Sequence, residues 1–544
     1  MSEAAPHFQY RTSPDQRSAK PIRHPVVIAG GGPVGLAMAM DLVERGIPAV
    51  LLDEDDTVST GSRSICWAKR TLEIYDRLGC AEPMMARGIT WNLGKVFHGD
   101  KMLYEFNLLP EGGHRFPAFI NLQQNLAEEI FVAHARSLAN RGLDLRWKNR
   151  VVDAAEHADH VRVEIETPDG PYALECDYLV AADGVRSTVR RVLGLDFKGQ
   201  VFEDRFLITD VRMHADFPTE RRFWFDPTFH AGRSALLHRQ ADDVWRIDLQ
   251  LGPDADPETE RQPERVTARL RHMLGPRRHF EIEWVSLYTF QCRRLDRFRH
   301  GRVLFAGDSA HQVSPFGARG GNGGVQDADN LAWKLALVLQ GRAPERLLDS
   351  YDAERIPAAD ENILHSARAT DFMTPKTPAS AAFRDAALGL AERFPFARGL
   401  VNSGRLSRPA ILEGSPLNTE DSDSFAPAMR PGSPCADAPL LRGDGTRSWL
   451  LRELQNGFTA LYFGDDDAPL VSTAARAEFP VPVAMRRIGT GALGDPTGAA
   501  SERYDARPGT LYLIRPDQHV AARWRKPDAR VLGGALGRAI ALQE

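Results

Sequence analysis

Cysteine is scarce in this chain and never occurs in closely spaced pairs. Five cysteines are spread over 544 residues, and no Cys-x-x-Cys pattern is present. Structural zinc sites and dense disulfide frameworks both need cysteines at short, regular spacings, so the sequence predicts neither, and no metal site is expected. Isolated thiols fit a reducing compartment. The cysteines are Cys66, Cys80, Cys176, Cys292 and Cys435.

Long apolar runs and an excess of one charge are also absent. The apolar stretches, such as AVLL before Asp53, fall far short of the roughly 20 residues that cross a bilayer. Lysine and arginine number 68 against 73 aspartates and glutamates, a formal net charge of −5. That mild balance argues against a nucleic acid or an anionic membrane as partner. No signal-type segment opens the chain, so we expect a soluble, cytoplasmic protein.

The sequence is instead rich in short β-branched runs that alternate with helical stretches, which predicts an α/β fold. A length of 544 residues with 43% apolar positions suits about three folding units. Between residues 201 and 289, strand-like pieces such as FLITDVRM and WRIDLQL predict an inserted antiparallel sheet. The expected organisation is a flexible N-terminal tail at 1–22, an α/β domain at 23–200 and 290–375, an antiparallel-sheet domain at 201–289, a helix and linker at 376–428, and a small α/β domain at 429–544.

The clearest motif is a glycine-rich turn, GGGPVG at residues 30–35, between the strand VVIA and a helix. In a dinucleotide-binding βαβ unit, the three spaced glycines permit the turn, the approach of a pyrophosphate and close helix packing. An acid at the end of the second strand binds the ribose, and Asp53 stands there. The sequence therefore predicts that this turn binds a dinucleotide, either FAD or NAD, and this interpretation is favoured over a glycine turn that binds no ligand. The candidate residues are Gly30, Gly32, Pro33, Val34, Gly35, Asp53 and Glu54.

Two later segments each place an aspartate after a strand and just before a turn. Asp183 follows the strand-like YLVAA, and Asp308 follows VLFAG. The second segment continues through a glycine-rich loop, residues 320–324, into a helix. An aspartate before a turn is also a common helix cap, so each residue alone leaves both interpretations open.

With these three motifs in order, the sequence resembles the flavoprotein aromatic hydroxylases, single-component FAD monooxygenases that include phenol and 3-(3-hydroxyphenyl)propionate hydroxylases. The resemblance extends from Pro25 to the C-terminus. It implies a Rossmann-type FAD-binding domain, with the inserted antiparallel sheet covering the substrate, and a thioredoxin-like C-terminal domain. Redox chemistry in that last domain would need two neighbouring cysteines, and only Cys435 is present, so a structural role is expected.

The resemblance also implies roles for individual residues. The glycine turn and Asp53 would hold the AMP half of FAD, and Asp308 would bind its ribityl chain. Arg63 and Gln124 would reach the pyrophosphate, with Gln123 as the neighbouring alternative to Gln124. Asp183 would serve both FAD and the nicotinamide nucleotide, and the isoalloxazine ring would lie beside the glycine-rich loop. The implied residues of these segments are Arg63, Gln124, Asp183, Gly307, Asp308, Pro315, Gly320, Gly321 and Asn322.

The implied activity is hydroxylation of a phenol or aromatic acid with NADH or NADPH and dioxygen, through a flavin hydroperoxide. Two alternatives stay open: a non-oxygenating FAD oxidoreductase acting on a quinone-like substrate, and a flavin-binding protein without turnover. A homodimer is compatible with all three of these functions. The sequence identifies no catalytic residue; the polar candidates are His230, His238, Tyr288 and Arg319.

The glycine-rich loop departs from the family pattern at one position. Many relatives read Gly-Gln-Gly-Met-Asn where this chain reads Ala-Arg-Gly-Gly-Asn at 318–322. A cationic Arg319 would either raise the reduction potential of the flavin or pair with an anionic substrate. A separate aromatic cluster on strand-like sequence is expected to pack in the core or the sheet rather than stack on substrate. They are Phe223, Trp224, Phe225 and Phe229.

Overall fold

The glycine turn joins the central strand of a parallel sheet to a buried helix. The computed structural model describes residues 6–61, 63–252, 254–401, 406–454, 456–465 and 479–542. Strands β11, β1, β2, β8 and β18 run parallel, and the hairpin β9–β10 pairs antiparallel with β11. The sheet contains β17 (Arg299–His300), β18 (Val303–Phe305), β11 (Tyr172–Ala181), β1 (Ile22–Ala29), β2 (Ala49–Leu52), β8 (Leu143–Arg146), β10 (Val161–Glu166) and β9 (Arg150–Glu156).

Helices cover the parallel strands, which is why the inner residues of β1 and β2 are apolar and buried on both faces. Helix α1 packs against α8 and α4, and α8 packs against α9. No helix within the described ranges is long and apolar enough to cross a membrane. The helices around this sheet are α1 (Pro33–Glu44), α4 (Gln124–Ser137), α5 (Thr188–Val192), α8 (Gly320–Leu339) and α9 (Asp349–Met373).

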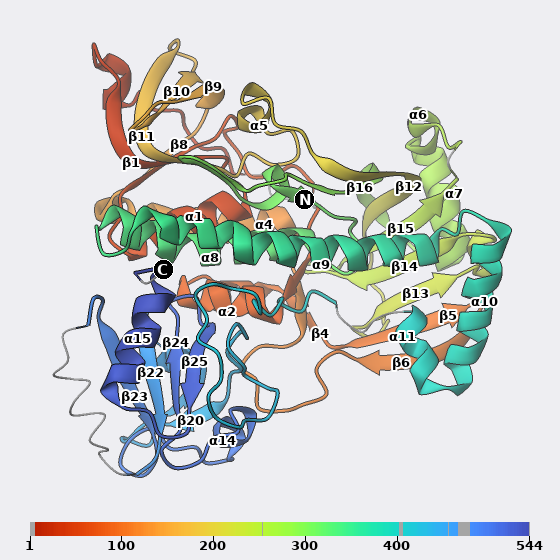
Figure 1. Ribbon diagram of the computed structural model, residues 1–544. Helices are drawn as coiled ribbons and strands as arrows, with labels where there is room; N and C mark the ends of the chain where they lie inside the picture. The colour runs from red at the N-terminus through yellow and green to blue at the C-terminus, as the bar shows by residue number, and fades with distance from the viewer. Residues whose placement is uncertain are drawn as a thin grey trace.

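A second sheet lies beside the first, on the right in Figure 1. One of its faces packs on α7 (Pro263–Leu274) through odd-numbered residues of β15 such as Ile247 and Leu249. The even-numbered residues therefore face the other way, toward the parallel sheet. In order, the strands are β19 (His311–Gln312), β16 (Glu281–Arg294), β12 (Lys198–Arg212), β15 (Val244–Leu251), β14 (Ser234–Arg239), β13 (Arg221–Phe225), β5 (Leu93–His98) and β6 (Lys101–Asn107).

This second sheet is wider than the 201–289 range expected from the sequence. Strands β12 and β16 extend to residues 198 and 294, and the hairpin β5–β6 comes from the segment expected in the α/β domain. The hairpin joins because β5 pairs in parallel with β13. Its partner strand lies more than a hundred residues away in sequence, so local composition carries no sign of the pairing.

Shorter elements connect the two sheets. Strand β7 pairs with β3 and β4 in a three-stranded antiparallel sheet, and the hairpin of α10 and α11 lies beside β6, in cyan in Figure 1. These elements are β3 (Cys66–Ala68), α2 (Lys69–Arg77), α3 (Ala81–Arg87), β4 (Ile89–Trp91), β7 (Phe119–Asn121), α6 (Pro257–Glu260), α10 (Pro378–Arg393) and α11 (Pro395–Val401).

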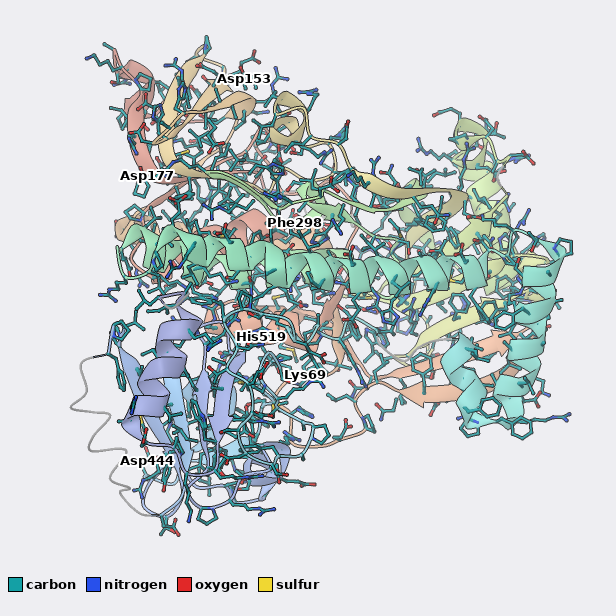
Figure 2. All side chains as sticks on the ribbon, in the orientation of Figure 1. Lys69, Asp153, Asp177, Phe298, Asp444 and His519 are labelled. Atoms are coloured by element: carbon teal, nitrogen blue, oxygen red, sulfur yellow. The ribbon has the colours of Figure 1, made fainter. Side chains whose placement is uncertain are left out.

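The C-terminal segment, blue in Figure 1, forms a four-stranded sheet in the order β23-β22-β24-β25. Strands β22 and β23 are parallel and the other pairs are antiparallel. Side chains fill the space between this segment and α2, where Figure 2 labels His519 and Lys69. The elements are β20 (Pro439–Leu441), β21 (Arg447–Trp449), α12 (Leu450–Glu453), β22 (Phe458–Phe463), β23 (Val483–Ile488), α14 (Ala499–Arg503), β24 (Leu511–Ile514), β25 (Val520–Trp524) and α15 (Ala529–Ala539).

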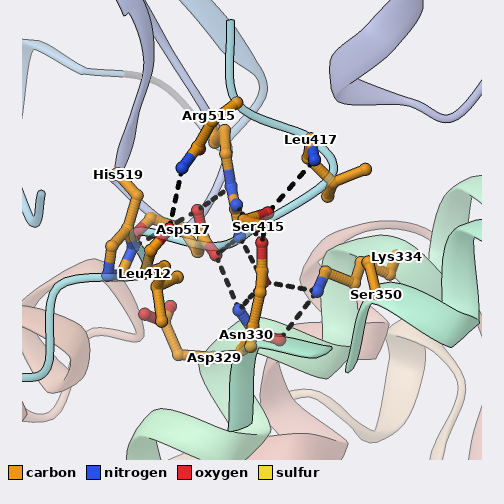
Figure 3. Close-up of polar contacts among 12 residues, drawn as sticks. Asp329, Asn330, Lys334, Ser350, Leu412, Ser415, Leu417, Arg515, Asp517 and His519 are labelled. Carbon is orange, nitrogen blue, oxygen red and sulfur yellow. Dashed lines mark hydrogen bonds and ion pairs between the residues drawn. The ribbon is translucent and has the colours of Figure 1, made fainter. Parts of the chain in front are cut away.

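A buried ionic cluster of four residues fastens the C-terminal segment to α8 and α9 (Figure 3). Arg515, in the turn between β24 and β25, donates to both carboxylate oxygens of Glu354 on α9, at 2.5 and 2.9 Å. Asp517 accepts from Arg515 at 2.6 Å, and Lys334 of α8 donates to Glu354 at 2.6 Å. All four side chains are 0% exposed. Such charges are stable in the interior only while every partner is present.

Residues 6–21 of the predicted N-terminal tail lie on the parallel sheet, with the 3-10 helix Pro14–Arg17 between His7 and β1. Phe8 is buried and stacks on Trp147 with ring centroids 4.3 Å apart. Asp15 pairs with Arg146 as well, so this mostly polar segment contacts the sheet through both an aromatic ring and an ion pair. Residues 1–5 of the expected tail lie outside the described residues.

Candidate active site

A cavity of about 310 Å³ lies where the carboxyl ends of the parallel strands face the second sheet. Open α/β sheets bind ligands at this edge. All three sequence motifs contribute to its wall or to the turns behind it. Of the sequence-predicted residues, those that line the cavity are Gly32, Pro33, Val34, Arg63, Gln124, Asp308, Pro315, Gly320 and Gly321.

The glycines of the first motif serve two purposes. A Cβ on Gly30 would collide with the carbonyl of Ala182, and a Cβ on Gly35 would collide with the carbonyl of Gly30, so these two permit close packing. A Cβ on Gly32 would meet nothing within 4 Å, although Gly32 borders the cavity. No internal contact requires glycine there, so the open side of Gly32 is room for a ligand at the N-terminus of α1, where backbone N–H groups favour a phosphate.

Asp53 lies behind the glycine turn, half-buried at the end of β2. Its carboxylate accepts hydrogen bonds from the backbone N–H groups of Gly31, at 2.5 Å, and Asp55, at 2.8 Å. Burial raises the pKa of Asp53 to about 6, and those two hydrogen bonds oppose the rise. Glu54 is exposed beside it. Neither residue lines the cavity itself, so Asp53 shapes the turn in this structure.

The two motif aspartates differ in their surroundings. Asp183 accepts a hydrogen bond from the backbone N–H of Val189 at 3.1 Å, in the first turn of α5, although the N-cap of that helix is Ser187 and the Oδ1 atom of Asp183 has no partner in the described part of the chain. Asp308 faces the cavity, and no residue in the described ranges donates a hydrogen bond to its carboxylate. Burial raises the pKa of Asp308, an effect that His311 and Arg63 oppose. Asp308 is thus an acceptor whose partner must come from a ligand or from solvent.

The glutamine alternative and the glycine-rich loop are placed by side-chain contacts. Gln124 lines the cavity and donates to Glu128 at 2.8 Å, whereas Gln123 points away and donates to the carbonyl of Ala241 at 3.1 Å. Gly307 has a φ of +66° and packs on Val34. The Asn322 amide does not line the cavity; it donates to the Cys66 carbonyl at 2.8 Å and accepts from the Ala68 N–H at 2.9 Å, which joins α8 to β3.

Polar residues of the second sheet, together with Arg319 before α8, complete the cavity. Only some of them were predicted from the sequence. Tyr288, His238 and Arg319 line the cavity, whereas His230 donates to the carbonyl of Gln250 at 2.6 Å outside it. Asp248 was missed. The alternation in VWRIDLQL, which puts every charged residue of β15 on one face, was the signal that could have found it.

Asp248 and His238 carry buried polar atoms without a protein partner. The Oδ1 atom of Asp248 and the Nδ1 atom of His238 make no hydrogen bond within the part of the chain that the structure describes. Burial raises the pKa of Asp248 to about 6, and burial holds the pKa of His238 well below its usual value. Neighbouring Arg246 is already bound to Asp210, at 2.9 and 2.8 Å. His238 is therefore a neutral imidazole at neutral pH. Asp248, with a pKa of about 6, is ionised at neutral pH and can accept a proton.

The donor set fits FAD. The open side of Gly32 and the N-terminus of α1 suit a pyrophosphate, and the unpartnered Asp308 carboxylate suits a polyol chain. Pro315, Gly320 and Gly321 line the cavity with small or apolar side chains, which leaves room for a ring system beside this loop. A nicotinamide dinucleotide alone would not account for the Asp308 segment.

Asp308→Ala is expected to weaken FAD binding. Loss of one hydrogen bond to the ribityl chain costs about 1 to 3 kcal/mol, which corresponds to a roughly 5- to 150-fold higher Kd. Titration of apoprotein with FAD, followed by quenching of flavin fluorescence, measures it. Asp308→Asn keeps a carbonyl acceptor and should lose less. An unchanged Kd in Asp308→Ala would remove Asp308 from the cofactor site.

Comparison with known proteins agrees with this geometry. The family described as "FAD binding domain" matches residues 23–366. The chain is 32% identical to 6-methylpretetramide 4-monooxygenase of Streptomyces rimosus over 94% of this chain and 92% of that protein. It is 27% identical to 3-(3-hydroxy-phenyl)propionate/3-hydroxycinnamic acid hydroxylase of Mycolicibacterium smegmatis, over 91% and 90% of the two chains.

Among solved structures, aklavinone-11 hydroxylase in a ternary complex with FAD and aklavinone superposes with a TM-score of 0.77 at 26% identity. The match covers 95% of this chain and 99% of that one. These findings confirm the resemblance drawn from the three motifs. The chain therefore belongs to the flavoprotein aromatic hydroxylase family of FAD-dependent monooxygenases.

Proposed function

We propose that this protein hydroxylates a phenolic or aromatic-acid substrate, with FAD in the cavity and with NADH or NADPH and dioxygen as co-substrates. The observation that carries the proposal is that two sides of one cavity carry different sets of polar groups. Gly32 and Asp308 offer a cofactor site on one side, and the partnerless Asp248 and His238 offer a proton-handling site on the other.

We assign roles to the architecture on the same basis. The parallel sheet with α1 and α8 is the Rossmann-type FAD-binding domain, and the second sheet is the substrate domain. The C-terminal segment is the thioredoxin-like domain. Support comes from the position of the cavity at the carboxyl ends of β1, β11 and β18 and from the similarity over the whole chain.

Bound FAD supplies hydride acceptance and oxygen activation. The chain supplies position and exclusion of water. Trp284, Ile208 and Leu236 give the second-sheet wall an apolar surface around the polar groups, and the Pro315 to Gly321 loop closes the opposite side. A dry pocket favours oxygen transfer over loss of peroxide. Asp248, when ionised, accepts the proton of a substrate hydroxyl, which makes the ring more electron-rich.

Asp248→Asn tests the proton-accepting role. We expect kcat for phenols with a pKa near 10 to fall roughly 100-fold, with FAD affinity unchanged. With para-nitrophenol, which is ionised at pH 8, the loss should be much smaller. In the wild type, kcat should drop as pH falls through about 6, where Asp248 takes up its proton. Asp248 would be ruled out as the base if kcat fell equally for both kinds of phenol, or if kcat of the variant still dropped as the pH fell through about 6.

Cys435→Ser tests whether the C-terminal segment takes part in redox chemistry. Cys435 is buried, and burial raises the pKa of its thiol to about 12, so no thiolate is available at neutral pH. The variant should keep its kcat and KM for NAD(P)H oxidation. Abolished turnover in a folded, FAD-loaded variant would overturn the structural role.

The function itself is tested with a panel of phenols and aromatic acids. We expect some of them to stimulate coupled consumption of NAD(P)H and oxygen, with a hydroxylated product found by mass spectrometry. Reduction of quinones without oxygen uptake would favour the non-oxygenating oxidoreductase. The absence of any stimulated NAD(P)H oxidation across the panel would favour a flavin-binding protein without turnover.

A further inference from the structure

A second cavity, of about 200 Å³, adjoins the first. Arg221, Phe316 and Arg319 line both cavities, so the two adjoin at these residues. The second cavity is bounded by β13, by the loop before α8 and by α9. It lies beyond the residues that hold FAD, on the side of α11, and no step of the proposed mechanism uses it.

The walls of the second cavity are largely aromatic. Phe223 and Phe225 of β13 lie with ring centroids 4.6 Å apart, and Phe372 of α9 packs edge-on against Phe225 at 5.6 Å. Phe316 and Phe106 also line it. Phe223 and Phe225 were expected to pack only within the sheet; they do pack there, and they also face this cavity. Trp224 and Phe229 pack on the opposite face. Such walls suit a flat apolar body.

The charged residues of the second cavity all have one sign. Its described lining contains the cations Lys95, Arg221, Arg319 and Arg368, together with His365, and no aspartate or glutamate. Lys95 already pairs with Glu220 at 2.8 Å. Arg319 is buried and donates to the amide oxygen of Asn362 at 3.3 Å. Arg221 has no carboxylate of any described residue within ion-pair distance, 4.0 Å.

An uncompensated guanidinium is unfavourable in an aromatic cavity, and an anion that enters supplies the missing charge. Burial lowers the pKa of Arg221, and the charge of Asp248, which lies beyond ion-pair distance, only partly opposes that effect. Arginine also binds planar oxyanions such as carboxylates through two parallel hydrogen bonds. Phenylalanine walls next to Arg221 select ligands that are both aromatic and anionic.

We propose that the substrate carries an anionic oxygen group, typified by a carboxylate, which lies between Arg221 and Arg319 in the second cavity while the ring to be hydroxylated lies in the first. This inference rests on the proposed function and narrows its substrate class. It also chooses between the two roles that the sequence left open for Arg319, because a residue shared by both cavities is placed to meet the substrate.

The test compares each acid with its uncharged amide on the FAD-loaded enzyme. The probes are 3-(3-hydroxyphenyl)propionate and 6-hydroxy-2-naphthoate with their primary amides, titrated at pH 8 by the change in flavin absorbance. For at least one pair, we expect the acid to bind ten or more times tighter than its amide. Arg221→Gln and Arg319→Gln should each reduce that ratio to below threefold. Arg222→Gln is the matched control, because Arg222 pairs with Glu220 and lies outside the cavity; its ratio should not change.

Two results would overturn the proposal. One is equal binding of acid and amide, or no binding of either acid, in the wild type. The other is an unchanged preference for acid over amide in both variants, together with a lower reduction potential of the flavin in Arg319→Gln. That result would assign Arg319 to the cofactor. Neither result touches the proposed function if a neutral phenol is still converted to a hydroxylated product, so the two failures are distinguishable.

Discussion

Gly32→Val is expected to give a folded protein that does not hold FAD. The backbone of Gly32 has φ −75° and ψ −176°, an extended conformation open to valine, and a Cβ there meets nothing within 4 Å. The apoprotein therefore has space for the side chain. The pyrophosphate needs the same space, so the clash falls on the cofactor alone and should cost at least about 3 kcal/mol, a Kd more than roughly 100-fold higher.

Absorbance at 450 nm of the purified variant and an FAD titration measure the effect. Gly389→Val is the matched control: Gly389 lies in α10, its Cβ also meets open space, and it lies outside the cavity. That variant should stay yellow. Circular dichroism should show both variants folded. A Gly32→Val protein with a full complement of FAD would contradict the placement of the pyrophosphate.

Arg515→Met is expected to lower the free energy of unfolding by about 3 to 5 kcal/mol. Methionine fills most of the space but leaves Glu354 and Asp517 with too little positive charge in a fully buried site. Because the bonds between Arg515 and Glu354 join the C-terminal segment to α9, that segment should detach from α9 before the rest of the protein unfolds. Urea unfolding followed by tryptophan fluorescence, with limited proteolysis of residues 429–544, reports on both effects.

The difference in free energy of unfolding between the wild type and Arg515→Met should depend on pH with a defined sign. Arg515 holds the pKa of Glu354 and that of Asp517 below their ordinary values. The stabilisation is thus fully present above about pH 5 and is lost as the pH falls and the carboxylates take up protons. Wild type and Arg515→Met should converge in stability on acidification.

Arg452→Met is the control, because Arg452 lies in the C-terminal segment but joins it to α2 and α3 through an exposed contact. Arg452 pairs with Asp76 at 3.0 Å and Glu82 at 2.7 Å, and its side chain is 41% exposed. Water screens such a pair, so the loss should stay below about 1 kcal/mol. Equal losses in Arg452→Met and Arg515→Met would show that the buried ionic cluster has no special part in holding the C-terminal segment.

The features that the sequence predicted are those with a local cause. The glycine turn at 30–35 and the Asp308 turn are each built by neighbouring residues, and both appear where expected. The α/β class follows from periodicity and is confirmed by the sheets. The Gln124 assignment came from the family resemblance, and in the structure Gln124 lines the cavity and donates a hydrogen bond to Glu128.

The features that escaped prediction depend on partners distant in the chain. The pairing of β5 with β13 and the anchoring of Phe8 on Trp147 have no local pattern. Asn322 sits in a motif, yet its amide is satisfied by β3, some 250 residues earlier. Asp248 faces the cavity only because β15 presents its even-numbered residues to the parallel sheet, a direction that strand sequence alone leaves undetermined.

In the proposed function, one cavity brings a flavin and a phenolic ring together so that an oxygen atom is inserted. The most direct measurement is turnover of the FAD-loaded enzyme with NAD(P)H under ¹⁸O₂, with products analysed by mass spectrometry. We expect one labelled oxygen atom in each hydroxylated product. A product whose new oxygen comes from water, or substrate turnover without any new oxygen, would contradict it.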